Sequence, residues 1–286
     1  MYPEQEEPEA PAAYAGGSMK SKAFHLEGLI PLVLILIIVA FLGAKFGFWN
    51  LPFLPGMNQK ISMLIIGAPS DNINNVLFEN RDLVQYRIKD ASSMSINAKE
   101  QLAQYDIVML NQSTMSDKSI SRQLGDALEN YVKTGGKLIT VLDSGIYRGG
   151  EMGIAKDVTG WVGTIGDIVP VDCTPLADNT PSCTRAINVR GQIVRMDFSH
   201  PIMKGIEFAP SLPGEEPYAI TTFQITTTGK EIAYIKNMVT PAYYPGIVEK
   251  NLVLGKSIYF NYDPGLTPAI FEKTLEYLSG KGGMFG

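Results

Sequence analysis

The sequence has very few of the residues that most often build metal and nucleophile sites. Its 286 residues include only two cysteines and two histidines. A structural zinc site normally needs four ligands, so the sequence predicts no metal site, and it implies no other cofactor. The net charge is −5 and no basic stripe follows residue 60, which argues against nucleic acid as a partner. The Gly-rich segments match neither a P-loop nor a dinucleotide fingerprint.

One long apolar run is present, from Gly28 to Ala44, and it continues through Trp49. A helix of about 20 residues is long enough to cross a hydrocarbon core of about 30 Å. The run therefore predicts a single membrane-spanning anchor within residues 20–50 that contacts membrane lipid through residues 28–49. A cleaved signal peptide is the alternative, but its apolar core has only about 7–15 residues. Lys and Arg are nearly balanced at the two ends, so charge does not decide the orientation.

The composition on either side of this run divides the rest of the chain. The acidic, Pro-containing residues 1–19 predict a disordered tail. The Pro-containing residues 51–59 predict a stiff linker, and the Gly-rich residues 281–286 predict a flexible tail. Residues 60–280 have the composition of a water-soluble domain and are numerous enough for one substantial core.

Within this domain, short apolar runs alternate with helical patterns. We expect strands at 61–67, 84–88, 105–111 and 137–142, and helices at 72–79, 95–104 and 120–132. Such alternation is typical of a parallel sheet covered on both faces. The predicted fold class is α/β, a flavodoxin-like three-layer parallel sheet preceded by a single transmembrane helix.

The second half of the domain has a different pattern, which predicts β-hairpin elaboration. A hairpin is expected over 186–195, turning near Gly191. Two strands, 218–228 and 230–236, are expected to be joined at a Thr-Gly pair. A strand at 257–262 precedes a closing helix at 267–278, with Thr267 as N-cap and Pro268 at its first position.

Cys173 and Cys183 flank a segment with two prolines and an Asn-Thr pair, which indicates a loop folded back on itself. A disulfide between them would close a short ring, and two unrelated thiols are the alternative. Disulfides persist mainly in oxidising compartments, so we expect the domain to be extracytoplasmic.

Three segments resemble a known superfamily. The stretch from Tyr105 to Leu110, an amphipathic helix, and the stretch from Val132 to Val141 are similar to class I glutamine amidotransferase-like proteins, with the trehalose-utilisation (ThuA-like) branch nearest. The segments 200–206 and 255–260 resemble its histidine-proline segment and its terminal strand. Catalytic members carry a Cys on an elbow after the fourth strand. Leu142-Asp-Ser-Gly-Ile146 stands there instead, so the resemblance implies a non-catalytic member.

Ser144 is the one nucleophile candidate at this elbow, and a serine enzyme needs a base within hydrogen-bond reach. His25 precedes the apolar run, which leaves His200 as the base, with Asp143, Glu215 or Glu216 as the orienting acid. The non-catalytic alternative is that Asp-Ser-Gly is an ordinary strand-ending turn and that His200 hydrogen-bonds to the backbone. A metal held by Asp197, His200 and Glu215 is a further, weaker alternative.

The sequence therefore favours a membrane-anchored, non-enzymatic domain that binds a ligand or protein partners in an envelope or membrane assembly. No ligand-binding residues can be assigned. The competing hypothesis is a degenerate serine or metal-assisted hydrolase that uses Ser144, Asp143 and His200 on a small polar or sugar substrate.

Overall fold

The computed structural model describes residues 31–39, 60–149, 158–210 and 216–280. The chain forms two compact units, Met1–Asn58 and Gln59–Gly286. In the first unit, residues 31–39 are helical and every residue of that helix is exposed. Among the described residues, no helix is both long enough and apolar enough to cross a membrane. Most of the predicted anchor, both predicted tails and the linker lie outside the described residues, so those expectations stay predictions.

The second unit is built on a ten-stranded sheet whose order is β10-β8-β12-β13-β14-β5-β3-β1-β2, with β9 added beside β8. Its parallel half has the flavodoxin-like order, in which the second strand lies outside the first. These strands are β1 (Ile61–Gly67), β2 (Val84–Lys89), β3 (Ile107–Asn111), β5 (Lys137–Val141) and β14 (Lys256–Phe260). The predicted parallel α/β core is confirmed.

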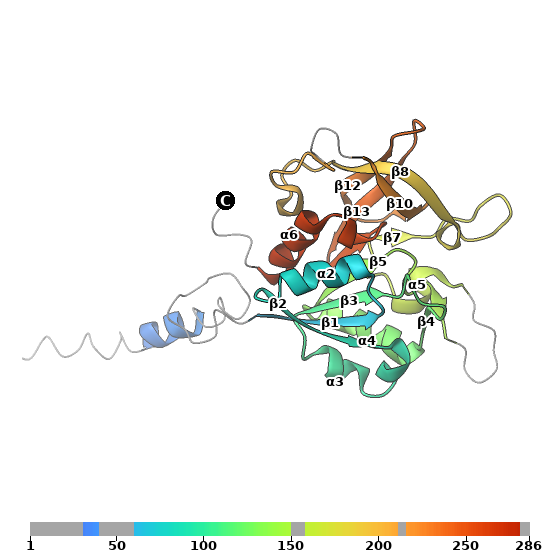
Figure 1. Cartoon of the computed structure of the whole chain (residues 1–286). Coiled ribbons are helices and arrows are strands. Elements are labelled where there is room, and N and C mark those ends of the chain that lie inside the picture. The colour runs from blue at the N-terminus through green and yellow to red at the C-terminus, as the bar shows by residue number, and fades with distance from the viewer. Residues whose placement is uncertain (1–30, 40–59, 150–157, 211–215, 281–286) are drawn as a thin grey trace, which may run out of the picture. The chain divides into compact units, whose positions relative to one another are not determined.

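Helices cover both faces of this parallel half, which explains why its strands are continuous apolar runs. Figure 1 shows α2 (Asp71–Glu79) and α6 (Pro268–Ser279) above the sheet, and α3 (Ala98–Leu102) and α4 (Arg122–Lys133) below it. The Ser121 hydroxyl caps α4 by accepting from Leu124 N at 3.2 Å. The buried face of α4 contains Leu128 and Val132, as its helical spacing predicts.

The antiparallel half extends the sheet from β14. Its strands are β13 (Tyr243–Asn251), β12 (Lys230–Asn237), β8 (Ala186–Arg195), β10 (Tyr218–Phe223) and the short β9 (Phe208–Ala209). The sequence pattern predicted no strand at β13, which joins the two halves. The coarse prediction of a parallel core with an antiparallel elaboration holds, although its strands are arranged differently.

The predicted hairpin turning at Gly191 is wrong, because β8 is one continuous strand. Gly191 lies in its middle and pairs with Tyr218 on one side and Asn237 on the other. A Cβ at this position would lie 2.8 Å from the Lys236 carbonyl oxygen. Glycine therefore permits a close approach of two backbones here and does not make a turn.

Three smaller expectations differ from the structure in detail. The short helix predicted at 95–104 is present as α3, and a 3₁₀ turn, η1 (Ala91–Met94), precedes it. The strands expected to be joined at Thr-Gly do not pair with each other, since β10 and β12 both flank β8 and β11 (Thr226–Thr227) pairs with β7 (Val171–Asp172). Thr267 is the N-cap residue of α6 and Pro268 begins the helix, as predicted, but the Thr267 hydroxyl bonds to the Tyr262 hydroxyl at 2.9 Å and caps no helical N–H.

Short elements complete the unit. They are β4 (Ser119–Ile120), β6 (Tyr147–Arg148), α5 (Gly160–Ile165), η2 (Ser182–Thr184), η3 (Pro201–Met203) and η4 (Pro264–Leu266). The predicted disulfide between Cys173 and Cys183 is confirmed, with their Cα atoms 5.2 Å apart. It ties the segment after β7 to η2.

Candidate functional site

The elbow after β5 is the position at which the sequence predicts chemistry. Parallel strands β1, β3 and β5 all end at this carboxyl edge, where open α/β sheets bind their ligands. Leu142 has a φ of 53°, and Gly145 has a φ of 83°. A positive φ at a leucine costs about 1–3 kcal/mol, so the surrounding contacts must hold the turn in place. Leu142 N donates to the Phe260 carbonyl at 2.8 Å, and Ser144 N donates to the Val141 carbonyl at 3.1 Å.

Ser144 is fully buried in this elbow, and hydrogen bonds already engage it on two sides. Its hydroxyl oxygen accepts from the backbone N–H of Gln112 at 2.7 Å. Its carbonyl accepts from the Trp161 indole N–H at 2.9 Å. The Gln112 side chain in turn accepts from Gly145 N at 3.1 Å. The hydroxyl of Ser144 therefore faces the end of β3 and stabilises the turn there.

Asp143 does not orient a histidine. Its carboxylate lies 2.6 Å from the ammonium of Lys118, and both side chains are mostly buried. Burial raises the pKa of Tyr147, and the charge of Asp143 raises it further. We call Gln112, Lys118, Asp143 and Ser144 the elbow cluster.

Asn111 lies beside the elbow cluster and was not predicted as a site residue. Its side-chain oxygen accepts from the Ser113 hydroxyl at 2.7 Å. Its side-chain nitrogen is buried and has no hydrogen-bond partner among the described residues. A Cβ on Gly67 would lie 2.1 Å from the Asn111 carbonyl oxygen, so the backbones of β1 and β3 approach closely at their carboxyl ends. The signal was visible in the sequence, where polar Asn111, Gln112 and Ser113 follow an apolar strand directly.

His200 lies in a different part of the domain. One ring nitrogen is 3.3 Å from a carboxylate oxygen of Glu249, and the other accepts from Ile202 N at 3.3 Å. The ring also packs edge-on against Tyr277, with centroids 4.8 Å apart. Its acidic partner is thus Glu249. Glu216 is an exposed residue paired with Arg190 at 3.5 Å, and Glu215 lies outside the described residues.

Glu249 is the centre of a buried charged group that sequence reasoning missed. Its carboxylate also accepts from the Tyr277 hydroxyl at 2.7 Å and lies 3.3 Å from the ammonium of Lys256. Burial alone would raise the pKa of Glu249, but the hydrogen bonds from His200 and Tyr277 and the charge of Lys256 outweigh it and hold the pKa at about 2. Burial, with the bond to Glu249, raises the pKa of Tyr277. We call His200, Glu249, Lys256 and Tyr277 the inner cluster.

The structure does not bring Ser144 and His200 together. Ser144 follows β5, while His200 bonds to Glu249 of β13. The strand order between them is β13-β14-β5. Adjacent strands lie about 4.8 Å apart, so two spacings separate β5 from β13 by roughly 10 Å. A serine and its general base need about 3 Å, and the predicted Ser144–His200–Asp143 arrangement is not assembled.

Of the three residues of the metal alternative, Asp197 and His200 bond to other side chains, and Glu215 lies outside the described residues. Asp197 lies 2.5 Å from the ammonium of Lys230 and accepts from the Ser199 hydroxyl at 2.8 Å. Within residues 31–39, 60–149, 158–210 and 216–280, no group of three or more His, Cys, Asp and Glu side chains could hold a metal ion.

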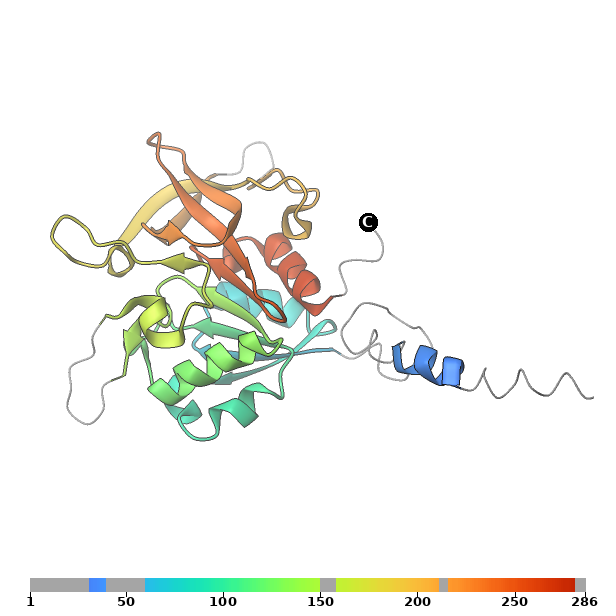
Figure 2. The same cartoon turned by 180° about the vertical axis from the view of Figure 1, so that it is seen from behind.

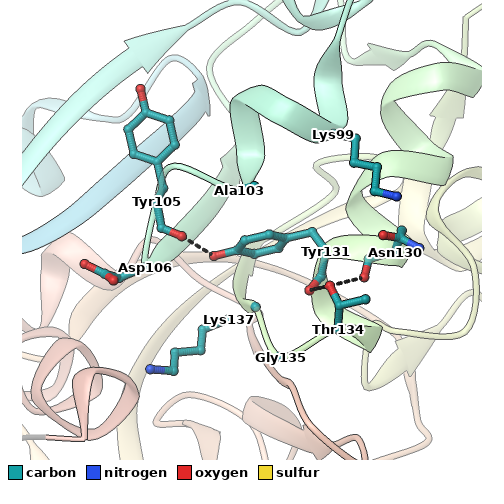
Figure 3. A pocket seen from close by; sticks show the side chains of 10 residues that line it. Lys99, Ala103, Tyr105, Asp106, Asn130, Tyr131, Thr134, Gly135 and Lys137 are labelled. Atoms are coloured by element: carbon teal, nitrogen blue, oxygen red, sulfur yellow. Dashed lines mark hydrogen bonds between the residues drawn. The ribbon is translucent and has the colours of Figure 1, made fainter. Parts of the chain in front are cut away.

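An open hollow of about 340 Å³ lies at the opposite edge, where β3 and β5 begin. Figure 3 shows Tyr131 lying across it, with its hydroxyl donating to the Tyr105 carbonyl at 3.0 Å. Lys99 and Lys137 extend to different sides of this ring. Burial lowers the pKa of Lys137, although nearby Asp106 opposes the shift. The hydroxyls of Tyr131 and Thr134 in its lining donate to backbone carbonyls, and none of the lining residues belongs to the elbow.

No protein-family model and no curated protein matches this sequence. The structure resembles a β-galactosidase from Bacillus circulans sp. alkalophilus, with a TM-score of 0.51 and 13% identity over 76% of this chain and 31% of the enzyme. It is also similar to a β-galactosidase from the haloarchaeon Halorubrum lacusprofundi (TM-score 0.47, 12% identity, 78% of this chain, 31% of that chain). A protein described as a GMP synthase component from Thermoplasma acidophilum matches over 77% of this chain and 95% of its own length (TM-score 0.38, 10% identity).

The chain therefore spans about a third of the length of the β-galactosidases it matches. At these identities the likeness concerns the fold alone. Together with the strand order, it supports a flavodoxin-like α/β fold, and the resemblance to class I glutamine amidotransferase-like proteins stays an expectation from the sequence.

Proposed function

We propose that this chain is a single-pass membrane protein whose α/β domain is a non-enzymatic interaction or ligand-binding module of an envelope or membrane assembly. The non-enzymatic part of this proposal rests on Ser144, which is buried and hydrogen-bonded in the elbow after β5. Ser144 replaces the cysteine of the catalytic relatives, is fully buried, and has its hydroxyl engaged by Gln112 N at 2.7 Å. A nucleophile must be exposed to its substrate and face a base, and Ser144 meets neither condition.

The anchor rests mainly on the apolar run 28–49 and its length. The helical residues 31–39 within it support the same interpretation, because all nine are exposed. Exposed apolar side chains such as Ile37 and Leu36 suit a helix whose surroundings are lipid. The disulfide between Cys173 and Cys183 favours an oxidising compartment, and hence an extracytoplasmic domain.

A hydrolase acting on a small polar or sugar substrate is the competing function. Some structural neighbours are β-galactosidases, but a shared fold does not imply a shared activity. The hydrolase would need His200 to leave the inner cluster and cross two strand spacings, roughly 10 Å, to reach Ser144. Nothing in the two hydrogen-bond networks favours such a movement.

Membrane topology is tested in intact cells that express the full chain. We expect the protein to stay in the membrane pellet after carbonate extraction. A membrane-impermeant maleimide should label Cys173 and Cys183 only after reductant is added, because both thiols are bonded and outside. Extraction into the supernatant would refute the anchor. Labelling by a permeant reagent without reductant would refute the disulfide and weaken the extracytoplasmic assignment.

The non-enzymatic assignment is tested with a fluorophosphonate probe, which labels serines activated by a base. We expect labelling of the full chain to equal that of its Ser144→Ala variant. Labelling lost in both Ser144→Ala and His200→Ala, while circular dichroism shows each variant folded at the assay temperature, would establish the hydrolase instead.

A further inference from the structure

We propose that the amino edge of the parallel sheet faces the bilayer, and that the turn containing Val253 and Leu254 contacts the lipid interface. This inference rests on the membrane anchoring proposed above. It goes further by assigning a lipid-contacting surface and an orientation to the folded domain.

The first observation is the register of the sheet. Lys256 pairs with Lys137, Lys137 with Ile107, and Ile107 with Met63. All four residues therefore lie at the same level across β14, β5, β3 and β1. Three residues before Met63 is Lys60, where the domain begins, and three residues before Lys256 is Val253. Both project from the amino edge, roughly 14 Å apart across three strand spacings.

The second observation is the length of the tether. Ten residues, 50–59, join the end of the apolar run to Lys60. Ten residues span at most about 33–36 Å when fully extended, and prolines among them restrict the chain further. An anchored apolar run therefore keeps Lys60, at the amino edge, within about 33–36 Å of the bilayer surface, while the carboxyl edge can lie farther away.

The third observation is what this edge exposes. Val253 is 100% exposed and Leu254 is 67% exposed. Phe78, 64% exposed, lies in the last turn of α2, which runs back from the carboxyl edge and ends at the same amino edge. The Arg81 guanidinium lies 5.3 Å from the Phe78 ring centre. Aliphatic, aromatic and cationic groups together are the composition that favours a lipid headgroup boundary.

The turn is held rigidly in this position. Leu252 N donates to the Gly255 carbonyl at 3.0 Å and closes it. A Cβ at Gly255 would lie 1.8 Å from the Val132 carbonyl oxygen, so the turn packs directly on the end of α4. In this turn the side chains of Val253 and Leu254 are exposed. They present their side chains outward from the edge.

The domain supplies its own control at the other end of β13. Val239 is 76% exposed, at the tip of the hairpin between β12 and β13. The nine residues of β13 separate this tip from the Val253 turn by about 30 Å at 3.3 Å per residue. Figures 1 and 2 show this hairpin projecting at the top of the domain, away from the start of β1. The exposed fractions of Val239 and Leu254 are thus similar, and the two residues differ in the end of β13 at which they lie.

The test uses the full chain, reconstituted in vesicles of phosphatidylcholine and phosphatidylglycerol. A single cysteine is added as Leu254→Cys, or as Val239→Cys in the control, and labelled with the fluorophore NBD. The native cysteines do not compete, because they are bonded to each other. We expect NBD at 254 to shift to the blue and to be quenched several-fold more by brominated lipids than NBD at 239. Melting temperatures of both labelled variants check that the fold is kept.

Flotation of the same vesicles separates the two proposals. A chain that floats while NBD at 254 reports water, or is quenched no more than NBD at 239, overturns the orientation alone. Stronger quenching at 239 places the opposite end against lipid and also overturns it. A chain that fails to float refutes the anchoring and the inference with it.

Discussion

Two polar clusters of this domain differ in what their side chains bond to. The elbow cluster at the end of β5 is held largely by backbone groups, since Ser144 accepts from Gln112 N and bonds through its carbonyl to Trp161. The inner cluster is held by side chains from β13, β14, α6 and the segment before η3, with Glu249 at its centre. The first stabilises a local turn, whereas the second fastens α6 and the segment before η3 to the sheet. Residues that together look like a catalytic set therefore have two unrelated structural roles.

The largest expected effect comes from removing the centre of the inner cluster. Glu249→Gln leaves the ammonium of Lys256 and its neighbours without their buried counter-charge. Breaking such a pair costs about 3–5 kcal/mol in free energy of unfolding. Urea denaturation measures it, with Glu231→Gln on the neighbouring strand β12 as the matched control. A loss below about 1 kcal/mol, the range of exposed pairs, would show that the inner cluster does not fasten α6.

Acid should weaken the inner cluster selectively. The pKa of Glu249 is lowered from 4.5 to about 2 in the folded protein. A lowered folded pKa contributes stability that is complete above about pH 4.5 and disappears as the pH falls to about 2. The contribution is on the order of 3 kcal/mol. Denaturation midpoints at successive pH values should fall more steeply for the native chain than for Glu249→Gln across this window. Parallel curves would contradict the assignment.

Local patterns in the sequence predict the parallel half well and the inner cluster not at all. Strand β1 is buried on both faces by helices, so it is a continuous apolar run that can be recognised without knowing its partners. Strand β13 contains Pro245, Gly246 and two charged residues, and only its pairing with β12 and β14 makes it a strand. The pairing of β13 with its neighbouring strands therefore outweighs the low strand propensity of these residues.

The same difference between local patterns and tertiary contacts explains which site residues could be located from the sequence. The elbow is a local feature, so Ser144 and Asp143 could be located by their position after an apolar strand. His200 and Glu249 are 49 residues apart in the chain, and the tertiary contact that joins them leaves no local pattern. Charge type alone offered Asp143, Glu215 and Glu216 as acids for His200. The acid that the fold supplies was not among them.

A smaller loss of stability is expected at the elbow. Ser144→Ala removes the acceptor of the buried N–H of Gln112, and an unsatisfied buried donor costs about 1–3 kcal/mol. Ser92→Ala is the control, because this serine is exposed in η1 and its change should cost no more than about 0.5 kcal/mol. Equal losses in the two variants would show that the hydroxyl of Ser144 does not stabilise the turn.

The smallest expected effect separates the two clusters most sharply. If they are independent, the free-energy changes of Ser144→Ala and His200→Ala add within about 0.5 kcal/mol in the double variant, since residues more than 7–10 Å apart rarely couple. The cycle of His200→Ala with Glu249→Gln should instead show coupling of about 0.5–3 kcal/mol, because those side chains lie 3.3 Å apart. Coupling between Ser144 and His200 as large as that in the second cycle would mean that they do meet in a populated state. It would also restore the hydrolase hypothesis.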